Sequence, residues 1–217
     1  MADLFTQEHD RASDEPQVTH LGHGIFHIKH LASTESCLRR IDEITQEIPL
    51  RHMMTPMGYP TKASMSNCGK YGWVSDLDGY RYSERDPISQ QPWPALPREF
   101  LQIHQSACQL ANISSFLPDA CLINRYEISQ SMGRHKDKDE QDTSWPIVSI
   151  SLGLSAVFEV YPDNPEISPM KILLEDGDVL ILSSSSRLWA HGVKPIKADL
   201  LQPNLTTRYN LTLRRSH

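Results

Sequence analysis

The sequence predicts an α+β fold in which short antiparallel strands form a sandwich or jelly roll supported by helices. Two amphipathic helix patterns occur before residue 112, and short strand patterns separated by turn signals occur after residue 118. Many short strands at close spacing are typical of sandwiches and jelly rolls. The chain of 217 residues is long enough for one domain with a sizeable core, which we expect over residues 21 to 217.

Two ranges carry apolar residues at helical spacing and predict packing helices. The first range is 34 to 48, where Ser33 or Thr34 would cap the helix and Pro49 would end it. The second range is 97 to 111. Both helices are expected to support one side of the sheets.

The segment of about residues 50 to 96, between the helices, is rich in glycine, proline and aromatic residues. Its aromatic residues include Tyr59, Tyr71, Trp73, Tyr80, Tyr82 and Trp93. So long a segment inside a compact domain is usually functional, so we expect a lid over a binding site. Exposed aromatic rings there would suit a base taken out of its stack, whereas each ring could equally be a core residue.

The strands of the jelly-roll core are expected between about residues 118 and 215. Their ranges are 121 to 126, 147 to 153, 156 to 161, 171 to 175, 179 to 183 and 206 to 214. Turn signals separate them, such as Pro-Asp-Asn-Pro at 162 to 165 and Glu-Asp-Gly-Asp at 175 to 178.

His135 and Asp137 are separated by one residue, so a strand would place both side chains on one face. His191 lies downstream and is the candidate for a third ligand. Two histidines and one carboxylate on one side of a metal leave positions open, as in non-haem Fe(II) oxygenases. The alternative is a solvated turn, because residues 136 to 140 form a charged run.

Two of the expected strands present polar side chains on one face. In the first strand Asn124 and Tyr126 share this face with Leu122, and in the last strand the face carries Thr206, Arg208, Asn210, Thr212 and Arg214. Two arginines, two amides and a phenol near a metal would form a dicarboxylate site, since guanidinium groups pair with carboxylates in a bidentate manner. The alternative is an ordinary strand with one face in water.

The formal net charge is −6 and the isoelectric point is near 5.9, which argues against a broad basic surface for duplex DNA. Part of the acidity lies in residues 1 to 20, which we expect to be a mobile tail. A nucleic-acid partner would then be held by local contacts. We expect a cytoplasmic protein with four reduced cysteines, since we find no apolar run of about 20 residues, no signal-peptide pattern and no paired cysteine spacing.

Four motifs occur in order: Asn124-Arg125-Tyr126, His135-x-Asp137-Lys138-Asp139, His191-Gly192 and Arg208-Tyr209-Asn210-Leu211-Thr212-x-Arg214. At these spacings the chain resembles the bacterial AlkB-type alkylated-DNA repair dioxygenases, from about Arg51 to Arg214. The resemblance implies a double-stranded β-helix, which is a cupin-like jelly roll, with N-terminal helices and a nucleotide-recognition lid. It also implies Fe(II), with 2-oxoglutarate and O₂ as co-substrates.

The resemblance assigns a role to each residue of the site. The metal ligands and catalytic residues would be His135, Asp137 and His191. The 2-oxoglutarate residues would be Leu122, Asn124, Tyr126, Ser149, Arg208, Asn210 and Arg214, with Arg208 taking the distal carboxylate. The residues for the damaged base would be Thr55, Met65, Trp73, Tyr80, His135, Lys138 and Asp139, with Trp73 stacking the base against His135.

The activity that the resemblance implies is oxidative demethylation of bases such as 1-methyladenine and 3-methylcytosine, releasing formaldehyde, succinate and CO₂. The substrate would be single-stranded DNA, with RNA as a further candidate, and the enzyme would be a monomer. The rival functions are a 2-oxoglutarate-dependent hydroxylase of a peptide or small molecule and a non-catalytic lesion-binding module. The chain departs from the family at Leu182, where relatives carry a tryptophan beside the iron, and at Pro165, where they carry a basic residue facing the substrate.

Overall fold

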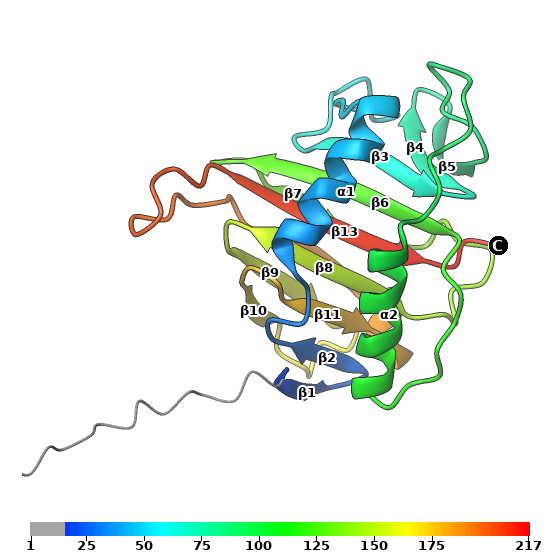
Figure 1. Cartoon of the computed structure of the whole chain (residues 1–217). Helices are drawn as coiled ribbons and strands as arrows, with labels where there is room; N and C mark the ends of the chain where they lie inside the picture. Colours follow the sequence, from blue (N-terminus) through cyan, green and yellow to red (C-terminus); the bar gives the residue numbers. More distant parts are fainter. Residues whose placement is uncertain (1–15) are drawn as a thin grey trace, which may run out of the picture.

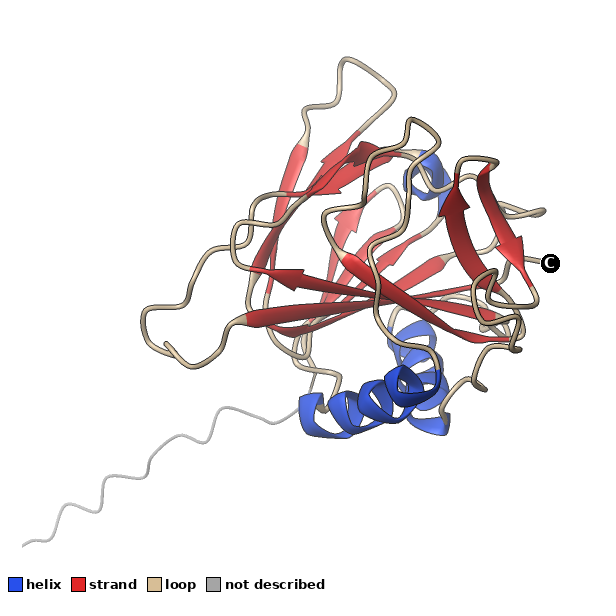
Figure 2. Ribbon diagram, turned by 90° about the horizontal axis from the view of Figure 1, so that it is seen from above, coloured by secondary structure: helices blue, strands red, loops and turns tan. Residues whose placement is uncertain are grey.

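A computed structural model describes residues 16–217 of the chain in three layers (Figures 1 and 2). Two helices cover one face of a seven-stranded sheet, and a four-stranded sheet faces its other side. A separate two-stranded hairpin stands beside the end of the large sheet. Every strand pairing in these three sheets is antiparallel, as expected for a jelly roll.

The large sheet contains strands from both ends of the described chain. In spatial order its strands are β1 (Val18–Gly22), β2 (Ile25–Ile28), β11 (Val179–Leu182), β8 (Ile147–Gly153), β13 (Thr207–Arg214), β6 (Ala120–Glu127) and β3 (Ser64–Gly69). β13 is hydrogen-bonded on both sides, to β8 and to β6, so the position of its backbone is strongly constrained.

The two smaller sheets are the four-stranded sheet and the hairpin. The four-stranded sheet has the order β10 (Met170–Leu174), β9 (Ala156–Tyr161), β12 (Ala190–Val193) and β7 (Met132–His135). The hairpin consists of β4 (Gly72–Asp76) and β5 (Gly79–Ser83), and a short 3₁₀ helix η1 (Ser184–Leu188) joins β11 to β12.

The helices form where their apolar stripes can pack on the large sheet. They are α1 (Thr34–Glu47), capped by the side chain of Ser33, and α2 (Arg98–Leu110), which begins directly after Pro97. Ile41 of α1 and Phe100 of α2 are buried in one cluster with strand residues such as Leu211. Burying each such side chain contributes roughly 1.5 to 3 kcal/mol.

Alternation along the strands separates an apolar core from a polar interior. In β11, Val179 and Ile181 pack towards the helices, whereas Leu180 and Leu182 pack between the two sheets. In β13, the apolar face is the one beneath the helices, and Asn210, Thr212 and Arg214 line a cavity on the other face. The space between the sheets is therefore apolar at one end and polar at the other.

Most expected elements are confirmed, with two corrections to their boundaries. The expected lid of residues 50 to 96 was too wide, because β3 lies within it and pairs with β6 in the large sheet. The expected tail of residues 1 to 20 also ran too far, because β1 begins at Val18 and pairs with β2. Residues 1 to 15 of that tail lie outside the described part.

Two further expectations concern the chemistry of the chain. All four cysteines are free and buried, as expected for reduced thiols. In the part of the chain that the structure describes, neither helix has the length and apolar character needed to cross a membrane.

One buried histidine links the fold to pH. His104 of α2 is 2% exposed, and its ring meets that of Phe116 edge-on at a centroid distance of 4.4 Å. Burial lowers the pKa of His104 from 6.5 to about 4. Because the pKa of His104 is lower in the folded state than in the unfolded state, its effect leaves the free energy of unfolding highest above about pH 6.5. The free energy of unfolding then decreases as the pH falls towards about 4.

We therefore expect His104→Leu to make the protein less sensitive to acid. Between about pH 7.5 and about pH 5, the wild type should lose about 2 kcal/mol more of its free energy of unfolding than the variant. Urea denaturation of both proteins at both pH values measures this difference, since other titrating groups are common to the two. Equal losses would contradict the role of His104.

Candidate active site

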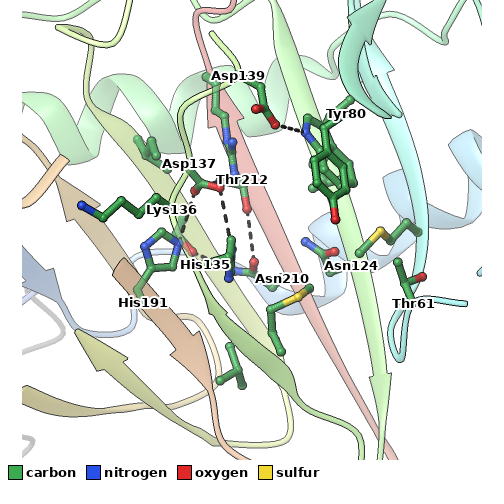
Figure 3. Close-up of a pocket in the computed structure, with 18 of the residues that line it drawn as sticks. Thr61, Tyr80, Asn124, His135, Lys136, Asp137, Asp139, His191, Asn210 and Thr212 are labelled. Atoms are coloured by element: carbon green, nitrogen blue, oxygen red, sulfur yellow. Dashed lines mark hydrogen bonds and ion pairs between the residues drawn. The ribbon is translucent and has the colours of Figure 1, made fainter. Parts of the chain in front are cut away.

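A cavity of about 370 Å³ lies at the polar end of the space between the sheets (Figure 3). Its walls come from the large sheet, the four-stranded sheet, the hairpin β4–β5 and the loop after β7. Nearly all of the expected site residues line it: Thr55, Met65, Trp73, Tyr80, Leu122, Asn124, Tyr126, His135, Asp137, Lys138, Asp139, Ser149, His191, Asn210 and Arg214. The exception is Arg208.

The three expected metal ligands meet at one point of this cavity. One ligand atom from each of His135, Asp137 and His191 lies within 4.8 Å of the others. The Nε2 atom of His135 is 3.7 Å from Asp137 Oδ1, and that of His191 is 3.3 Å from Asp137 Oδ2. His135 and His191 come from neighbouring strands in direct register.

The expected strand geometry around these ligands was wrong in one respect. β7 ends at His135, so Asp137 lies in the following loop and not on the same strand face. Its position is set by Arg214, whose Nη2 atom donates to Asp137 Oδ2 at 2.8 Å. Arg187 Nη1 also donates to the backbone oxygen of Asp137 at 2.8 Å, which fixes the loop itself.

The protonation of the three side chains fits a divalent metal. Backbone carbonyl oxygens lie 2.8 Å from Nδ1 of His135 and 3.1 Å from Nδ1 of His191, so each Nδ1 carries the proton. Each Nε2 lone pair then faces Asp137, as in metal sites where a second hydrogen bond orients the ligand. Burial raises the pKa of Asp137, but the pKa lies well below its usual range, with the charge of Arg214 as the largest opposing cause. Burial lowers the pKa of His135, which favours the neutral, ligating form.

Arg208 is buried behind the cavity wall and has an unusual environment. Its guanidinium donates to Leu154 O at 3.1 Å and to Ser151 Oγ at 2.8 Å, while Nε has no partner. Among the described residues no carboxylate lies within 4 Å of it. Burial lowers the pKa of Arg208 to about 10. A buried cation without a counter-charge is costly, so this site favours a ligand that carries a carboxylate.

Other polar groups of this wall are also available to a ligand. The Oδ1 atom of Asn124 is buried without a hydrogen-bond partner. Asn210 donates to Ser149 Oγ at 2.7 Å, which holds both side chains at the cavity. Tyr126 is 2% exposed, and burial raises the pKa of its hydroxyl to about 12, so it remains a neutral donor.

The hairpin presents an aromatic pair to the cavity. The rings of Trp73 and Tyr80 are stacked, with centroids 5.4 Å apart and planes at 15°. The Trp73 indole donates from Nε1 to Asp139 Oδ2 at 2.8 Å, so the position of that carboxylate depends on the hairpin (Figure 3). Trp93, by contrast, is a core residue, with 6% of its surface exposed.

Several lining residues were not assigned from the sequence. They are Thr61, Met132, Lys136, Ile147, Phe158, Val193 and Thr212. Only Thr212 had a usable signal, because it shares a strand face with Asn210 and Arg214. Leu182 lines the apolar end of the cavity, whereas Pro165 is exposed in the turn after β9 and does not line it.

Comparisons with known proteins agree with this geometry. Residues 24–214 match the family described as the 2OG-Fe(II) oxygenase superfamily. The whole chain is 41% identical to 98% of the alpha-ketoglutarate-dependent dioxygenase AlkB of Escherichia coli (strain K12). It is 28% identical, over 57% of its length, to 32% of the nucleic acid dioxygenase ALKBH1 of Homo sapiens. The solved structure of OsALKBH1 covers 92% of this chain and is itself covered completely, with a TM-score of 0.76 and 28% identity.

Loss of the charge should affect the stability of the protein differently at the two buried arginines, Arg208 and Arg214. We expect Arg208→Met to leave the free energy of unfolding of the ligand-free protein within about 1 kcal/mol of the wild-type value or to raise it, since a buried charge is replaced by an apolar side chain. Arg214→Met should cost about 3 to 5 kcal/mol, because it leaves buried Asp137 without its guanidinium partner and leaves Glu140 with only Arg187. Thermal and urea denaturation without ligand measure both. A large loss in Arg208→Met would show that its charge is already balanced.

Proposed function

The chain belongs to the 2OG-Fe(II) oxygenase superfamily, in its AlkB-type branch, and we propose that it dealkylates damaged bases in nucleic acid. The observation that carries this proposal is one cavity that holds both the His135–Asp137–His191 group and the Trp73–Tyr80 pair. The first part suits oxidation, and the second suits a base removed from its stack.

His135, Asp137 and His191 would hold Fe(II) through two Nε2 atoms and a carboxylate oxygen. When bound, Fe(II) would supply activation of O₂, with one oxygen atom passing to 2-oxoglutarate to give succinate and CO₂ and the other entering a C–H bond of the alkyl group. For an N-methyl group, the resulting hydroxymethyl amine then releases formaldehyde and the repaired base. The protein's own part is to fix the three ligands on one side of the metal, which leaves the other side open.

For 2-oxoglutarate, Arg208 would bind the distal carboxylate and balance its own buried charge. The neutral hydroxyl of Tyr126 and the amide of Asn210 would complete that end. Leu122 and Ser149 would line its path, with Asn124 and Arg214 near the chelating end.

The damaged base would be stacked by Trp73 against His135, with Tyr80 supporting the tryptophan ring. Asp139 would face the base edge and favour lesions with positive charge, such as 1-methyladenine and 3-methylcytosine. Thr55 and Met65 would enclose the base, and Lys138 would contact the nucleic-acid backbone.

We also propose single-stranded DNA as the main substrate, acted on by a monomer in the cytoplasm. The net charge of −6 supports a single strand held by local contacts over a duplex held by a basic surface. The rival small-molecule hydroxylase would need the metal and Arg208 but not the Trp73–Tyr80 pair.

The test is a product assay with a panel of oligonucleotides. With Fe(II), 2-oxoglutarate and O₂, a single strand carrying 1-methyladenine or 3-methylcytosine should yield formaldehyde and succinate in equal amounts. The same strand without the methyl group should yield no formaldehyde, and His135→Ala should yield neither product with either strand. Equal succinate release with methylated and unmethylated strands would exclude coupled dealkylation and favour the rival hydroxylase.

Substitution of Trp73 tests base recognition separately from oxidation of 2-oxoglutarate. Stacking of a base on an aromatic ring contributes about 1 to 3 kcal/mol, so Trp73→Ala should reduce dealkylation at limiting DNA by roughly 5-fold to 150-fold. Succinate release without DNA should remain near the wild type, because Trp73 is outside the two sheets that carry the metal and 2-oxoglutarate residues. A melting curve on the same preparation is the control. Parallel loss of all three signals would identify Trp73 as a structural residue instead.

A further inference from the structure

A group of buried charges that pair with one another includes the candidate metal ligand Asp137. It consists of Asp137, Glu140, Arg187 and Arg214, together with the hydroxyl of Tyr82. The side chains of Glu140, Arg187 and Arg214 are 0%, 3% and 7% exposed. Two carboxylates and two guanidinium groups give this cluster no net charge.

Arg214 is held between the two carboxylates of the group. Its Nη2 atom donates to Asp137 Oδ2 at 2.8 Å, and its Nη1 atom donates to Glu140 Oε1 at 2.9 Å. The other oxygen of Glu140 lies 3.1 Å from Arg187 Nη2. Burial alone would raise the pKa of Glu140, but Arg214 and Arg187 outweigh it and keep that pKa below its usual value. Glu140 is therefore an anion that orients the arginine bound to Asp137.

The same carboxylate also reaches the hairpin. Tyr82 of β5 donates its hydroxyl to Glu140 Oε1 at 3.0 Å. The neighbouring residue Asp139 accepts the indole hydrogen bond of Trp73 in β4. Two consecutive residues of the loop after β7 thus fasten both strands of the hairpin, while Asp137 of that loop faces the metal position.

We propose that Glu140 is a positioning residue that holds Arg214 against Asp137 and, through Tyr82, fastens the base-binding hairpin to the metal site. This rests on the proposed function only in taking His135, Asp137 and His191 as the metal site. Glu140 lines neither the metal position nor the cavity, so it acts through Arg214 and Tyr82.

The charge of Glu140 and the length of its side chain predict different effects, the first on metal binding and the second on the hairpin. Glu140→Gln keeps the size of the side chain but leaves two guanidinium groups with one carboxylate. Arg214 then loses the anion that holds it against Asp137, and the excess positive charge opposes a dication. Loss of such an outer-shell partner lowers metal affinity by about 10-fold to 100-fold.

The experiment measures Mn(II) affinity by titration calorimetry and hydrogen exchange of residues 72 to 83 in the same full-length proteins. Tyr82→Phe removes the hydroxyl by which the hairpin reaches Glu140, and with it a 3.4 Å contact from Arg214 Nη1, but leaves every charge of the group in place. Glu140→Asp keeps the charge but shortens the side chain. Asp86→Asn is the matched control, because Asp86 is also a buried carboxylate paired with an arginine, Arg51, and does not line the cavity.

Glu140→Gln should weaken Mn(II) binding at least about 10-fold and speed exchange in the hairpin. Tyr82→Phe and Glu140→Asp should speed exchange while keeping Mn(II) affinity within about 3-fold of the wild type. Asp86→Asn should lower the melting temperature without changing Mn(II) affinity.

Wild-type Mn(II) affinity in Glu140→Gln, or an equal loss in Asp86→Asn, would overturn the proposal. If Glu140→Gln does not fold, unchanged hairpin exchange in both Tyr82→Phe and Glu140→Asp would overturn it as well. Neither readout needs turnover, so absence of dealkylation would count against the proposed function and not against this role of Glu140.

Discussion

The ion pair between Arg214 and Asp137 connects a strand hydrogen-bonded on both edges to the one candidate metal ligand that lies outside a strand. Asp137 comes after the end of β7, so no sheet hydrogen bond fixes it. Arg214 belongs to β13, which is paired along its length to β6 and on its other edge to β8. The carboxylate is therefore positioned by the centre of the large sheet across the cavity. His191 and His135 are positioned by the four-stranded sheet. The geometry of the candidate metal site therefore depends on the distance between this sheet and the large sheet.

The hairpin β4–β5 is tied to both sides of this arrangement. Asn67 of β3 exchanges two hydrogen bonds with the backbone of Trp73, at 2.9 and 3.0 Å, which joins the hairpin to the large sheet. Gly72 is required at its start, because a Cβ atom there would lie 2.3 Å from the ring of Trp93. The hairpin proposed to bind the base is therefore a braced element and not a loose loop.

Periodicity in the sequence predicted both helices and the central strands of the jelly roll. The predicted ranges agree with the structure to within one or two residues, because alternating or helical apolar patterns decide which face is buried. The roles of Glu140 and Arg187 were not predicted. A buried carboxylate inside the run from Lys136 to Glu140 is indistinguishable from a solvated one until its arginine partners, 47 and 74 residues further along, are known. β3 was likewise assigned to the lid, since its small and polar residues give no strand pattern.

The three candidate metal ligands differ greatly in their access to water. The side chain of His135 is 40% exposed, whereas those of Asp137 and His191 are 11% and 6% exposed. A chelator arriving from solvent would therefore meet the His135 side first, and a metal held there could leave without unfolding of the protein. The hydrogen bond from His135 Nδ1 to Gly133 O, at 2.8 Å, opposes rotation of that ring. We expect this one bond to control the rate of metal exchange, while the two buried ligands retain a half-formed site that is ready to be refilled.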